Sequence, residues 1–215
     1  MLELGCGTGR HASELAALGC TIHGVDRSDT MLAEATARAS ANAAHGAQMT
    51  FSAGDIRTVR LGQTFDAAIS LFHVISYQTS NDDLRAAFKT ARDHVVKGGL
   101  FLFDCWYGPG VLTDPPTVRA KRMSDELIEV TRIAEPVIDT TASTVEVRYD
   151  MFVRDRASGV VSEVQESHLM RYLFVTEIEL LLKDGSFKPL AFLEWMTDRA
   201  PSTTTWNLCA VARAV

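Results

Sequence analysis

The sequence predicts an α/β fold in which a mostly parallel sheet is followed by an antiparallel β insertion. Apolar strand-like runs alternate with helical periodicity over the first half of the chain, which indicates right-handed β–α–β crossovers. A glycine-rich turn stands between the first strand and the first helix. Period-two alternation of Val, Thr, Ile and Tyr then replaces this rhythm over 118–174. We expect one domain over 1–215, made of a core over 1–107, the insertion over 108–175, and a closing helix and strands over 176–215.

The elements of the core follow from hydrophobic spacing and from helix signals. Ser28 is the expected N-cap of the second helix, and Gly98-Gly99 is expected to end the third. Ligands of parallel sheets bind at the carboxyl ends of strands, so functional residues are expected just after strand ends. The expected strands are 2–4, 20–25, 49–53, 65–72 and 100–105, and the expected helices are 10–18, 28–41 and 82–96.

Turn residues mark the second half of the chain. A loop is expected over 108–116, and Ala157-Ser158-Gly159 is expected to close a hairpin between strands that include 144–149 and 163–173. Thr176 is expected to open a helix with a capping box to Glu179. Two closing strands are expected over 187–192 and 206–212.

Composition excludes several classes of function. The net charge of −6 argues against a broad phosphate-binding surface, so no nucleic-acid partner is expected. The dense basic run at Arg119, Lys121 and Arg122 is interpreted as the solvated face of a strand. The four cysteines lack metal-ligand spacing, so no metal is expected, and they suit a reducing compartment. No apolar run is long enough for a membrane span and no signal peptide is expected, which together predict a cytoplasmic protein.

The glycine loop Gly5-Cys6-Gly7-Thr8-Gly9 is the strongest motif. A dinucleotide fingerprint has the spacing G-x-G-x-x-G, which requires a third glycine where this chain has Arg10. The dinucleotide loop also serves a pyrophosphate, which Glu3 would repel. The methionine end of S-adenosylmethionine carries an ammonium, which Glu3 suits. We therefore predict S-adenosylmethionine as the cofactor and disfavour an NAD-dependent oxidoreductase.

Acids after the next two strands complete an adenosine site. Asp26 can accept both ribose hydroxyls, a feature that alone also fits NAD. Asp55 can accept from the adenine amine, with Ile56 against the ring and Met31 on its other face. Each acid taken alone fits a helix N-cap equally well, and Met31 alone fits core packing.

These motifs together resemble those of class I S-adenosylmethionine-dependent methyltransferases. Glu3-Leu4-Gly5-Cys6-Gly7-Thr8-Gly9 is similar to motif I of that family, and Gly24-Val25-Asp26 and Gly54-Asp55-Ile56 look like its next two motifs. The resemblance implies a Rossmann-like fold and S-adenosyl-L-homocysteine as a product. It implies that Glu3, Gly5 and Gly7 hold the methionine end, that Asp26 holds the ribose, that Asp55 and Ile56 hold the adenine, and that Phe72 closes a cofactor site completed by Cys6, Arg27, Met31 and Gly54.

The acceptor side is expected after the fourth and fifth strands. His73 can accept a proton from an attacking group, with Tyr77 orienting the acceptor; alternatively, His73 only bonds backbone. Trp106 and Tyr107 are expected as a substrate wall, or else as core and rim. His168 and Arg171 of the insertion are expected to contact a polar or phosphate-bearing acceptor, with a structural role as the alternative.

These residues resemble one branch of the family, small-molecule methyltransferases that include N-methyltransferases of amino sugars carried on nucleotides. The resemblance implies that the insertion covers the acceptor and forms a homodimer. It also implies helices ahead of the glycine loop that cover the cofactor, whereas this sequence begins with a stub of the first strand. We expect methyl transfer to an amino or hydroxyl group of a nucleotide-linked sugar. The alternative is a protein that binds S-adenosylmethionine with little or no turnover because that lid is absent.

Overall fold

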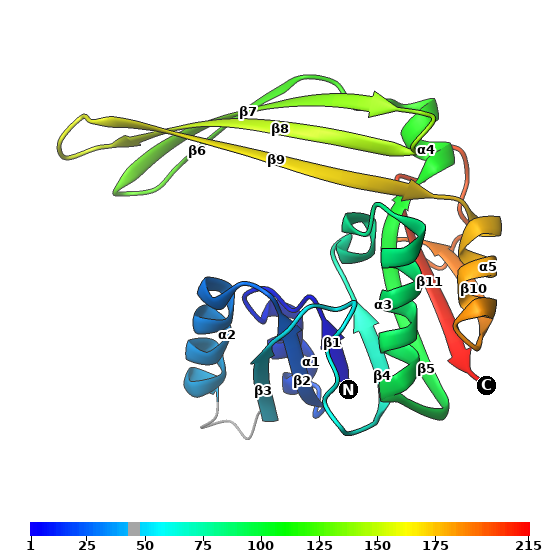
Figure 1. Ribbon diagram of the computed structural model, residues 1–215. Helices are drawn as coiled ribbons and strands as arrows, with labels where there is room; N and C mark the ends of the chain where they lie inside the picture. The colour runs from blue at the N-terminus through cyan, green and yellow to red at the C-terminus, as the bar shows by residue number, and fades with distance from the viewer. Residues whose placement is uncertain (43–47) are drawn as a thin grey trace.

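The computed structural model describes residues 1–42 and 48–215 and shows a body with a long β arm above it (Figure 1). The strand order is β3-β2-β1-β4-β5 through the body and continues through β9-β8-β7-β6 into the arm. The body strands are β1 (Leu2–Leu4), β2 (Thr21–Asp26), β3 (Gln48–Ala53), β4 (Phe65–Ser70) and β5 (Val95–Tyr107), and its first helices are α1 (Arg10–Ala17), α2 (Asp29–Asn42), the 3-10 turn η2 (Val74–Tyr77) and α3 (Asn81–His94).

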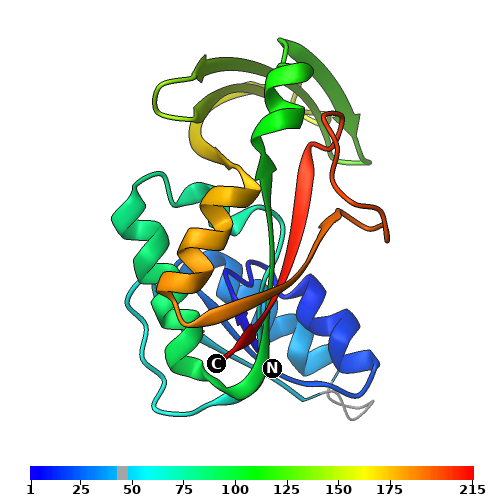
Figure 2. The ribbon, with the colours of Figure 1, turned by 90° about the vertical axis from the view of Figure 1, so that its right-hand side faces the viewer.

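The short strand β1 lies at the centre of the parallel part of the sheet. It pairs in parallel with β2 on one side and β4 on the other, and Leu2 and Leu4 are fully buried. Helices α1 and α2 cover one face of the sheet, while α3 covers the other (Figure 2). Under α3, the rings of Phe88, Phe101 and Phe103 pack with their centroids 4.9–5.5 Å apart. This core fixes the carboxyl ends of the strands, where the glycine loop begins.

The arm is an antiparallel sheet of β6 (Arg119–Ser124), β7 (Ile128–Asp139), β8 (Thr144–Asp155) and β9 (Val161–Leu173). It projects over the edge of the body formed by the carboxyl ends of β4 and β5 (Figure 1). The arm joins the body sheet where Trp106 and Tyr107 of β5 pair with Tyr172 and Leu173 of β9. Because side chains alternate along each strand, one face of the arm looks down on the body.

The chain closes on the opposite side of β5. Helix α5 (Val175–Asp184) packs beside α3, and β10 (Phe187–Glu194) pairs with β11 (Asn207–Ala214). Strand β11 runs antiparallel along β5, from Asn207 opposite Trp106 to Arg213 opposite Leu100 (Figure 2). The mostly parallel sheet with an antiparallel insertion is therefore confirmed.

Three local predictions were wrong. Helix α3 ends at His94 and β5 begins at Val95, so Gly98-Gly99 lies within the strand and caps nothing. The expected loop after β5 contains α4 (Gly108–Thr113), whose start accommodates Pro109 because the first turn needs no backbone donor there. Helix α5 begins after Phe174 without a side-chain cap, so no Thr176 capping box forms. The remaining elements lie within a few residues of their expected bounds.

Two expectations about surfaces can be compared with the structure. Every residue of β6 is exposed, which confirms that Arg119, Lys121 and Arg122 belong to a solvated strand. Over the described residues 1–42 and 48–215, no helix combines the length and apolarity that a bilayer span requires.

Candidate functional site

The glycine loop is shaped by its neighbours at the end of β1. The Gly5 and Cys6 N–H groups both donate to the Val25 carbonyl, at 2.8 and 3.0 Å. Asp26 accepts the Gly7 N–H at 2.8 Å and the Ser28 N–H at 2.9 Å. The Asp26 carboxylate, which is predicted to bind the ribose, therefore also holds the glycine loop against β2. The remaining acceptor positions of this carboxylate lie at the carboxyl ends of the strands.

Glu3 is a buried acid at the start of this loop. Its side chain is 1% exposed, and its Oε2 has no hydrogen-bond partner among the residues that the structure describes. Its Oε1 lies 3.4 Å from Nδ1 of His11, and this contact raises the pKa of His11 above its ordinary value. A buried carboxylate oxygen without a partner is costly unless a cation or donor reaches it. The loop residues therefore fit an ammonium group such as the one on the methionine end of S-adenosylmethionine.

Cys6 is not a nucleophile in this loop. Burial, and then the nearby charges of Glu3 and Asp26, raise the pKa of its thiol to about 12. A thiol with so high a pKa stays neutral near pH 7. It is therefore unreactive, because a nucleophilic cysteine needs a lowered pKa. Cys6 contributes shape to the loop.

The residues predicted to bind adenine already have contacts within the protein. Asp55 accepts the backbone N–H and Nε of Arg57, each at 2.9 Å, and Nη2 of the same residue at 2.6 Å. These contacts hold the pKa of Asp55 below its usual range, and they leave about one of its four acceptor positions for an adenine amine. Ile56 is buried in the main core, and Gly54 is packed against Val59.

Met31 and Arg27 stand at the rim. Met31 is half exposed, and its Sδ would lie 3.5 Å from a Cβ built on Gly7, so the thioether borders the loop. Arg27 is exposed and directly follows Asp26. Both side chains therefore lie beside the predicted cofactor site.

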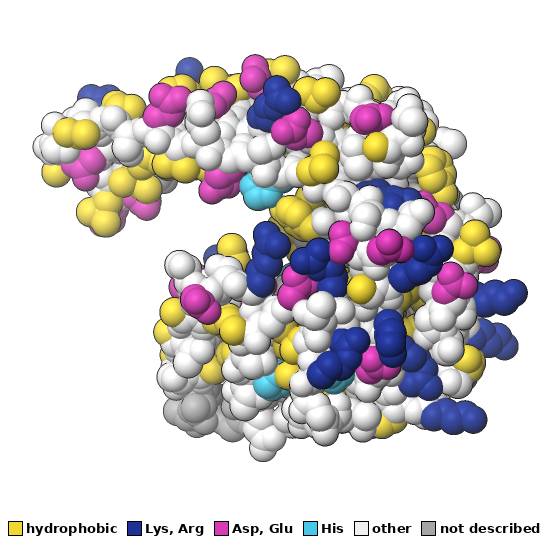
Figure 3. Space-filling model, in the orientation of Figure 1, with side chains coloured by type: hydrophobic (Ala, Val, Ile, Leu, Met, Phe, Trp, Pro, Cys, Tyr) yellow, Lys and Arg dark blue, Asp and Glu magenta, His cyan; other side chains and the backbone are white. Residues whose placement is uncertain are grey.

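A cavity of about 410 Å³ lies between the body and the arm. Figure 3 shows the hollow beneath the arm. The loop after β4, the end of β5 and the lower face of the arm all contribute to it. Its lining consists of Phe72, His73, Tyr77, Trp106, Arg132, Val147, Tyr149, Met151, Glu166, His168 and Met170. The structure thus brings together five residues predicted from three separate segments, namely Phe72, His73, Tyr77, Trp106 and His168.

A polar chain crosses this cleft. Tyr77 Oη lies 2.9 Å from Nδ1 of His168, and Nε2 of His168 lies 3.2 Å from Oε2 of Glu166. Burial, followed by Tyr149 and Glu166, raises the pKa of Tyr77, so its hydroxyl remains protonated near neutrality. The body loop and the arm are therefore joined by a chain of hydrogen-bonding groups that faces the cavity.

His73 sits in a strained turn beside a buried acid. Phe72 and His73 have φ of +65° and +64°, which non-glycine residues rarely adopt. Asp104 is fully buried and accepts the His73 N–H at 3.1–3.2 Å. Nδ1 of His73 lies 2.7 Å from Oδ2 of Asp104, a short contact whose angle departs from that of a good hydrogen bond.

Two predicted substrate residues lie outside the cleft lining. Tyr107 packs against the main core. Both terminal nitrogens of Arg171 are engaged, Nη1 with the Thr79 carbonyl at 3.2 Å and Nη2 with Glu177 of α5, while its Nε is buried without a partner among the described residues. Its neighbour along the strand, Met170, is on the cleft face instead, because adjacent strand residues point to opposite faces.

The sequence-based prediction missed several site residues. Asp104 could have been found from the sequence, because an acid within an apolar strand is costly to bury and therefore indicates a specific role. His11 had none, because an exposed-looking histidine in a first helical turn is unremarkable. Arg132 and Tyr149 required the strand register, which places the guanidinium 4.9 Å from the ring centroid of Tyr149.

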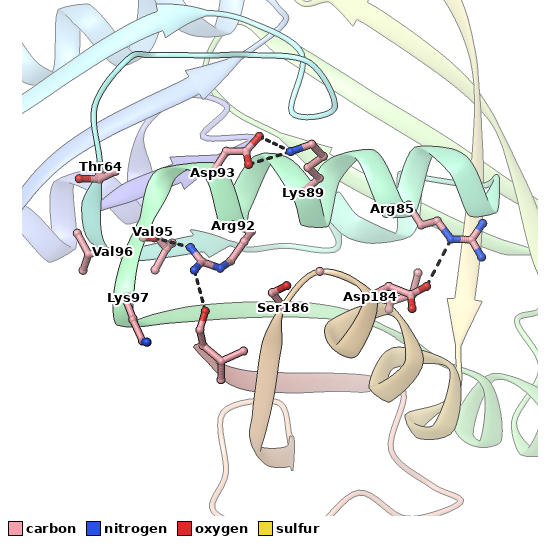
Figure 4. A pocket seen from close by; sticks show the side chains of 13 residues that line it. Thr64, Arg85, Lys89, Arg92, Asp93, Val95, Val96, Lys97, Asp184 and Ser186 are labelled. Atoms are coloured by element: carbon pink, nitrogen blue, oxygen red, sulfur yellow. Dashed lines mark hydrogen bonds and ion pairs between the residues drawn. The ribbon is translucent and has the colours of Figure 1, made fainter.

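A larger cavity, of about 700 Å³, lies elsewhere, between α3, α5 and the start of β5 (Figure 4). Its charges largely satisfy one another: Lys89 pairs with Asp93 at 3.0 Å, and Arg85 with Asp184 at 3.6 Å. Arg92 donates to the carbonyls of Val95 and Val215. It includes none of the predicted site residues. Within the described part of the chain, no cluster of three potential metal ligands is found.

Comparison with known proteins shows similarity to methyltransferases. A family model described as a methyltransferase domain matches residues 1–99. The chain is 27% identical to dTDP-3-amino-3,4,6-trideoxy-alpha-D-glucopyranose N,N-dimethyltransferase of Streptomyces venezuelae, over 83% of this chain and 71% of that one. It is 30% identical to dTDP-3-amino-3,6-dideoxy-alpha-D-glucopyranose N,N-dimethyltransferase of Streptomyces fradiae, over 78% of this chain and 62% of that one.

A solved structure extends the likeness to the whole fold. An S-adenosylmethionine-dependent methyltransferase from Clostridium acetobutylicum superposes with a TM-score of 0.84 at 23% identity, over 99% of this chain and 82% of that one. The match includes the arm as well as the body. Residues 1–99 therefore match a methyltransferase domain, the whole chain shares the fold of this solved methyltransferase, and S-adenosylmethionine is the cofactor.

Proposed function

We propose that the protein methylates the amino group of a nucleotide-linked sugar. The observation that carries this proposal is the cleft between the glycine-loop body and the arm, lined by the Tyr77–His168–Glu166 chain. Its volume suits a small acceptor. The two sequence relatives are named for N,N-dimethylation of dTDP-linked amino sugars, which supports the same acceptor class.

S-adenosylmethionine, when bound, supplies an electrophilic methyl group on a sulfonium. Glu3 takes the ammonium with its free Oε2, while Gly5, Cys6 and Gly7 let the backbone approach the methionine end. Asp26 holds the ribose. The remaining acceptor position of Asp55 takes the adenine amine, with Ile56, Met31, Gly54 and Arg27 around the ring and Phe72 closing the site.

The cleft residues then orient the acceptor. Tyr77 and His168 hydrogen-bond its polar groups, Trp106 forms a wall, and His73 receives the proton that the amine loses. Arg132 is a cation in the cleft whose Nε is buried and has no hydrogen-bond partner within the described part of the chain. It is therefore placed to pair with a phosphate oxygen of the nucleotide portion. Positioning in a water-poor cleft supplies much of the rate for such an in-line transfer.

The direct test is incubation with S-adenosylmethionine and dTDP-linked amino sugars. We expect S-adenosylhomocysteine and an acceptor mass increased by one or two methyl groups. Binding of S-adenosylmethionine without product from any amino sugar would instead support the cofactor-binding protein without turnover.

Two variants separate the acceptor and cofactor sides. Arg132→Met should raise KM for the acceptor about tenfold or more, because a charge-assisted bond is worth roughly 1.5–3 kcal/mol, and it should leave the Kd for S-adenosylmethionine unchanged. Arg122→Met on the exposed strand β6 is the matched control. Asp26→Ala should weaken the cofactor by about tenfold to a hundredfold, equivalent to roughly 1–3 kcal/mol, whereas Asp66→Ala, exposed on β4, should not.

We also propose a homodimer through the arm. Its far end exposes apolar side chains, including Leu127, Val160, Val161 and Val164, and such clustering is typical of association surfaces. Light scattering on the eluted protein should give twice the chain mass, and Val161→Glu with Val164→Glu should give the monomer mass. A monomer in the unmodified protein would contradict the proposal.

A further inference from the structure

Among the described residues, the polar contacts of the Asp104 carboxylate go to His73 alone. Asp104 lies near the carboxyl end of β5 and is fully buried. Its neighbours along the chain, Phe103 and Cys105, are fully buried as well. Both of its carboxylate oxygens lie within 3.2 Å of the His73 N–H, and Oδ2 is also 2.7 Å from the imidazole. A carboxylate buried among apolar groups is expensive unless it is paired. The arrangement therefore calls for a function in holding His73.

The turn that Asp104 holds is strained. Left-handed backbone at two successive non-glycine residues, Phe72 and His73, costs on the order of 1–3 kcal/mol each and persists only where surrounding contacts impose it. Asp104 provides one such contact. A second follows three residues later, where Ser76 Oγ accepts the Trp106 N–H at 2.9 Å. The whole loop is thus fastened at two points to the end of β5.

We propose that Asp104 is a positioning residue for methyl transfer, which acts by holding the His73 imidazole through Nδ1 and turning Nε2 to the cleft. This inference rests on the proposed function. His73 is largely buried and lines the cavity, so Nε2 is the ring nitrogen left for the acceptor.

The acceptor ammonium gives one proton to Nε2 of His73, and the freed lone pair forms the bond to the methyl carbon. The carbon–sulfur bond breaks with its electron pair remaining on sulfur. Asp104 offsets the positive charge that His73 gains, and the imidazolium later returns its proton to water.

Asp104→Asn separates the two contacts that Asp104 makes. The amide oxygen still accepts the His73 N–H and keeps the turn, but the negative charge opposite Nδ1 is lost. Asp139→Asn is the matched control, because Asp139 also accepts backbone N–H groups, those of Thr141 and Ala142, but in an exposed hairpin far along the chain.

The test combines kinetics with nitrogen NMR of the imidazole, assigned by the loss of its signal in His73→Gln. We expect Asp104→Asn to lower kcat by roughly a hundredfold, the lower end of what a positioned proton acceptor contributes, with KM for the acceptor and Kd for the cofactor unchanged. The unmodified protein should show His73 mainly with its proton on Nδ1, and Asp104→Asn should show a mixture of tautomers. Asp139→Asn should match the unmodified protein in both measurements.

Several outcomes would overturn the inference. One is an unchanged kcat in Asp104→Asn; another is a His73 tautomer that ignores the substitution. If Asp104→Asn does not fold, full kcat in His73→Gln, or a proton mainly on Nε2 in the unmodified protein, overturns it equally. If the unmodified protein methylates no amino sugar, the proposed function fails instead, and the NMR measurement still decides whether Asp104 holds His73.

Discussion

Gly5 lies where the glycine loop meets the 3-10 turn η2. Its φ is +79°, and a Cβ built there would stand 2.5 Å from Cγ1 of Val74, the first residue of η2. The glycine loop and the loop after β4, which we propose hold the two reacting partners, are therefore in contact at a position without a side chain. A side chain added at Gly5 would push these two loops apart.

We expect Gly5→Ala to destabilise the fold and to weaken cofactor binding. The matched control is Gly19→Ala, because Gly19 has a similar φ of +87° but open space around it. The control should cost about 1–2 kcal/mol, the usual penalty of left-handed backbone, and Gly5→Ala should cost more because Val74 must also move. Urea unfolding and calorimetric titration with S-adenosylmethionine measure the two effects. Equal losses in both variants would show that the contact with Val74 is unimportant.

His11 should make cofactor binding depend on pH. Glu3 raises the pKa of His11 above 6.5, and the negative charge of Asp104 makes a smaller contribution in the same direction. Protonated His11 therefore stabilises the folded state below pH 6.5, and this stabilisation is lost as pH rises through the raised pKa. Because the cofactor ammonium competes with protonated His11 for Glu3, affinity for S-adenosylmethionine should rise over the same range.

Calorimetric titrations over a pH series test this coupling. His11→Asn should flatten the rise in affinity and remove the low-pH stabilisation, a modest effect because the His11 side chain is 41% exposed. His23→Asn is a suitable control, because the His23 imidazole hydrogen-bonds Thr50 and Ser52 on β3 and not the Glu3 carboxylate. A pH dependence that survives in His11→Asn would assign the effect to another group.

At the scale of elements, β9 is held in place by Arg171. Its guanidinium reaches the Thr79 carbonyl just after η2 and the Glu177 carboxylate on α5. The same strand carries His168, which faces Tyr77 of η2 at 2.9 Å. The residue predicted to touch substrate therefore fixes the strand on which another cleft residue lies.

Arg171→Met should lower the free energy of unfolding by about 1–3 kcal/mol, because it leaves the partly buried Glu177 without its partner. It should also weaken acceptor binding through displacement of His168, with Kd for S-adenosylmethionine unchanged. Arg148→Met, which breaks the exposed pair with Glu146 on β8, should change neither quantity measurably. Urea unfolding and acceptor KM are the measurements, and a loss of cofactor affinity in Arg171→Met would contradict this division.

The elements could be predicted from sequence where a single pattern controls them. The parallel strands and the turn at Gly5-Cys6-Gly7 follow from apolar runs and glycine spacing. The helix end at His94 did not, because Val95 already pairs with Phe65 of β4 and thus draws the chain into strand before Gly98. In the site, Tyr77 and His168 were found separately, but their contact across 91 residues depends on how the arm folds back.

At the scale of the molecule, β5 belongs to both parts. It pairs with β4 and β11 in the body, and through its last two residues with β9 of the arm. The arm has a small core of its own at its base, where Val111, Val145, Val147 and Tyr172 pack together. Its outermost strand β6 is exposed at every residue and pairs only with β7 among the described strands.

Hydrogen exchange should reflect this division. Amides of β4, β5 and β11 should exchange slowest, because they lie in the main core, and those of β6 fastest among the strands. S-adenosylmethionine should protect the glycine loop and the segments 26–31 and 54–56 without slowing β6. Exchange followed by mass spectrometry gives the comparison peptide by peptide, and equal protection of β6 by the cofactor would show the two parts to be coupled as one unit.

The narrow join between β5 and β9 has a consequence for how new specificities arise. Val147, Tyr149 and Met151 point into the cleft from β8, and none belongs to the glycine loop or to the acids that follow β2 and β3. Replacements there reshape what the enzyme recognises while the methyl-donor machinery stays intact. A library of variants at these three positions should therefore yield enzymes with changed acceptor specificity. Natural divergence of the gene can change acceptor specificity through the same three positions.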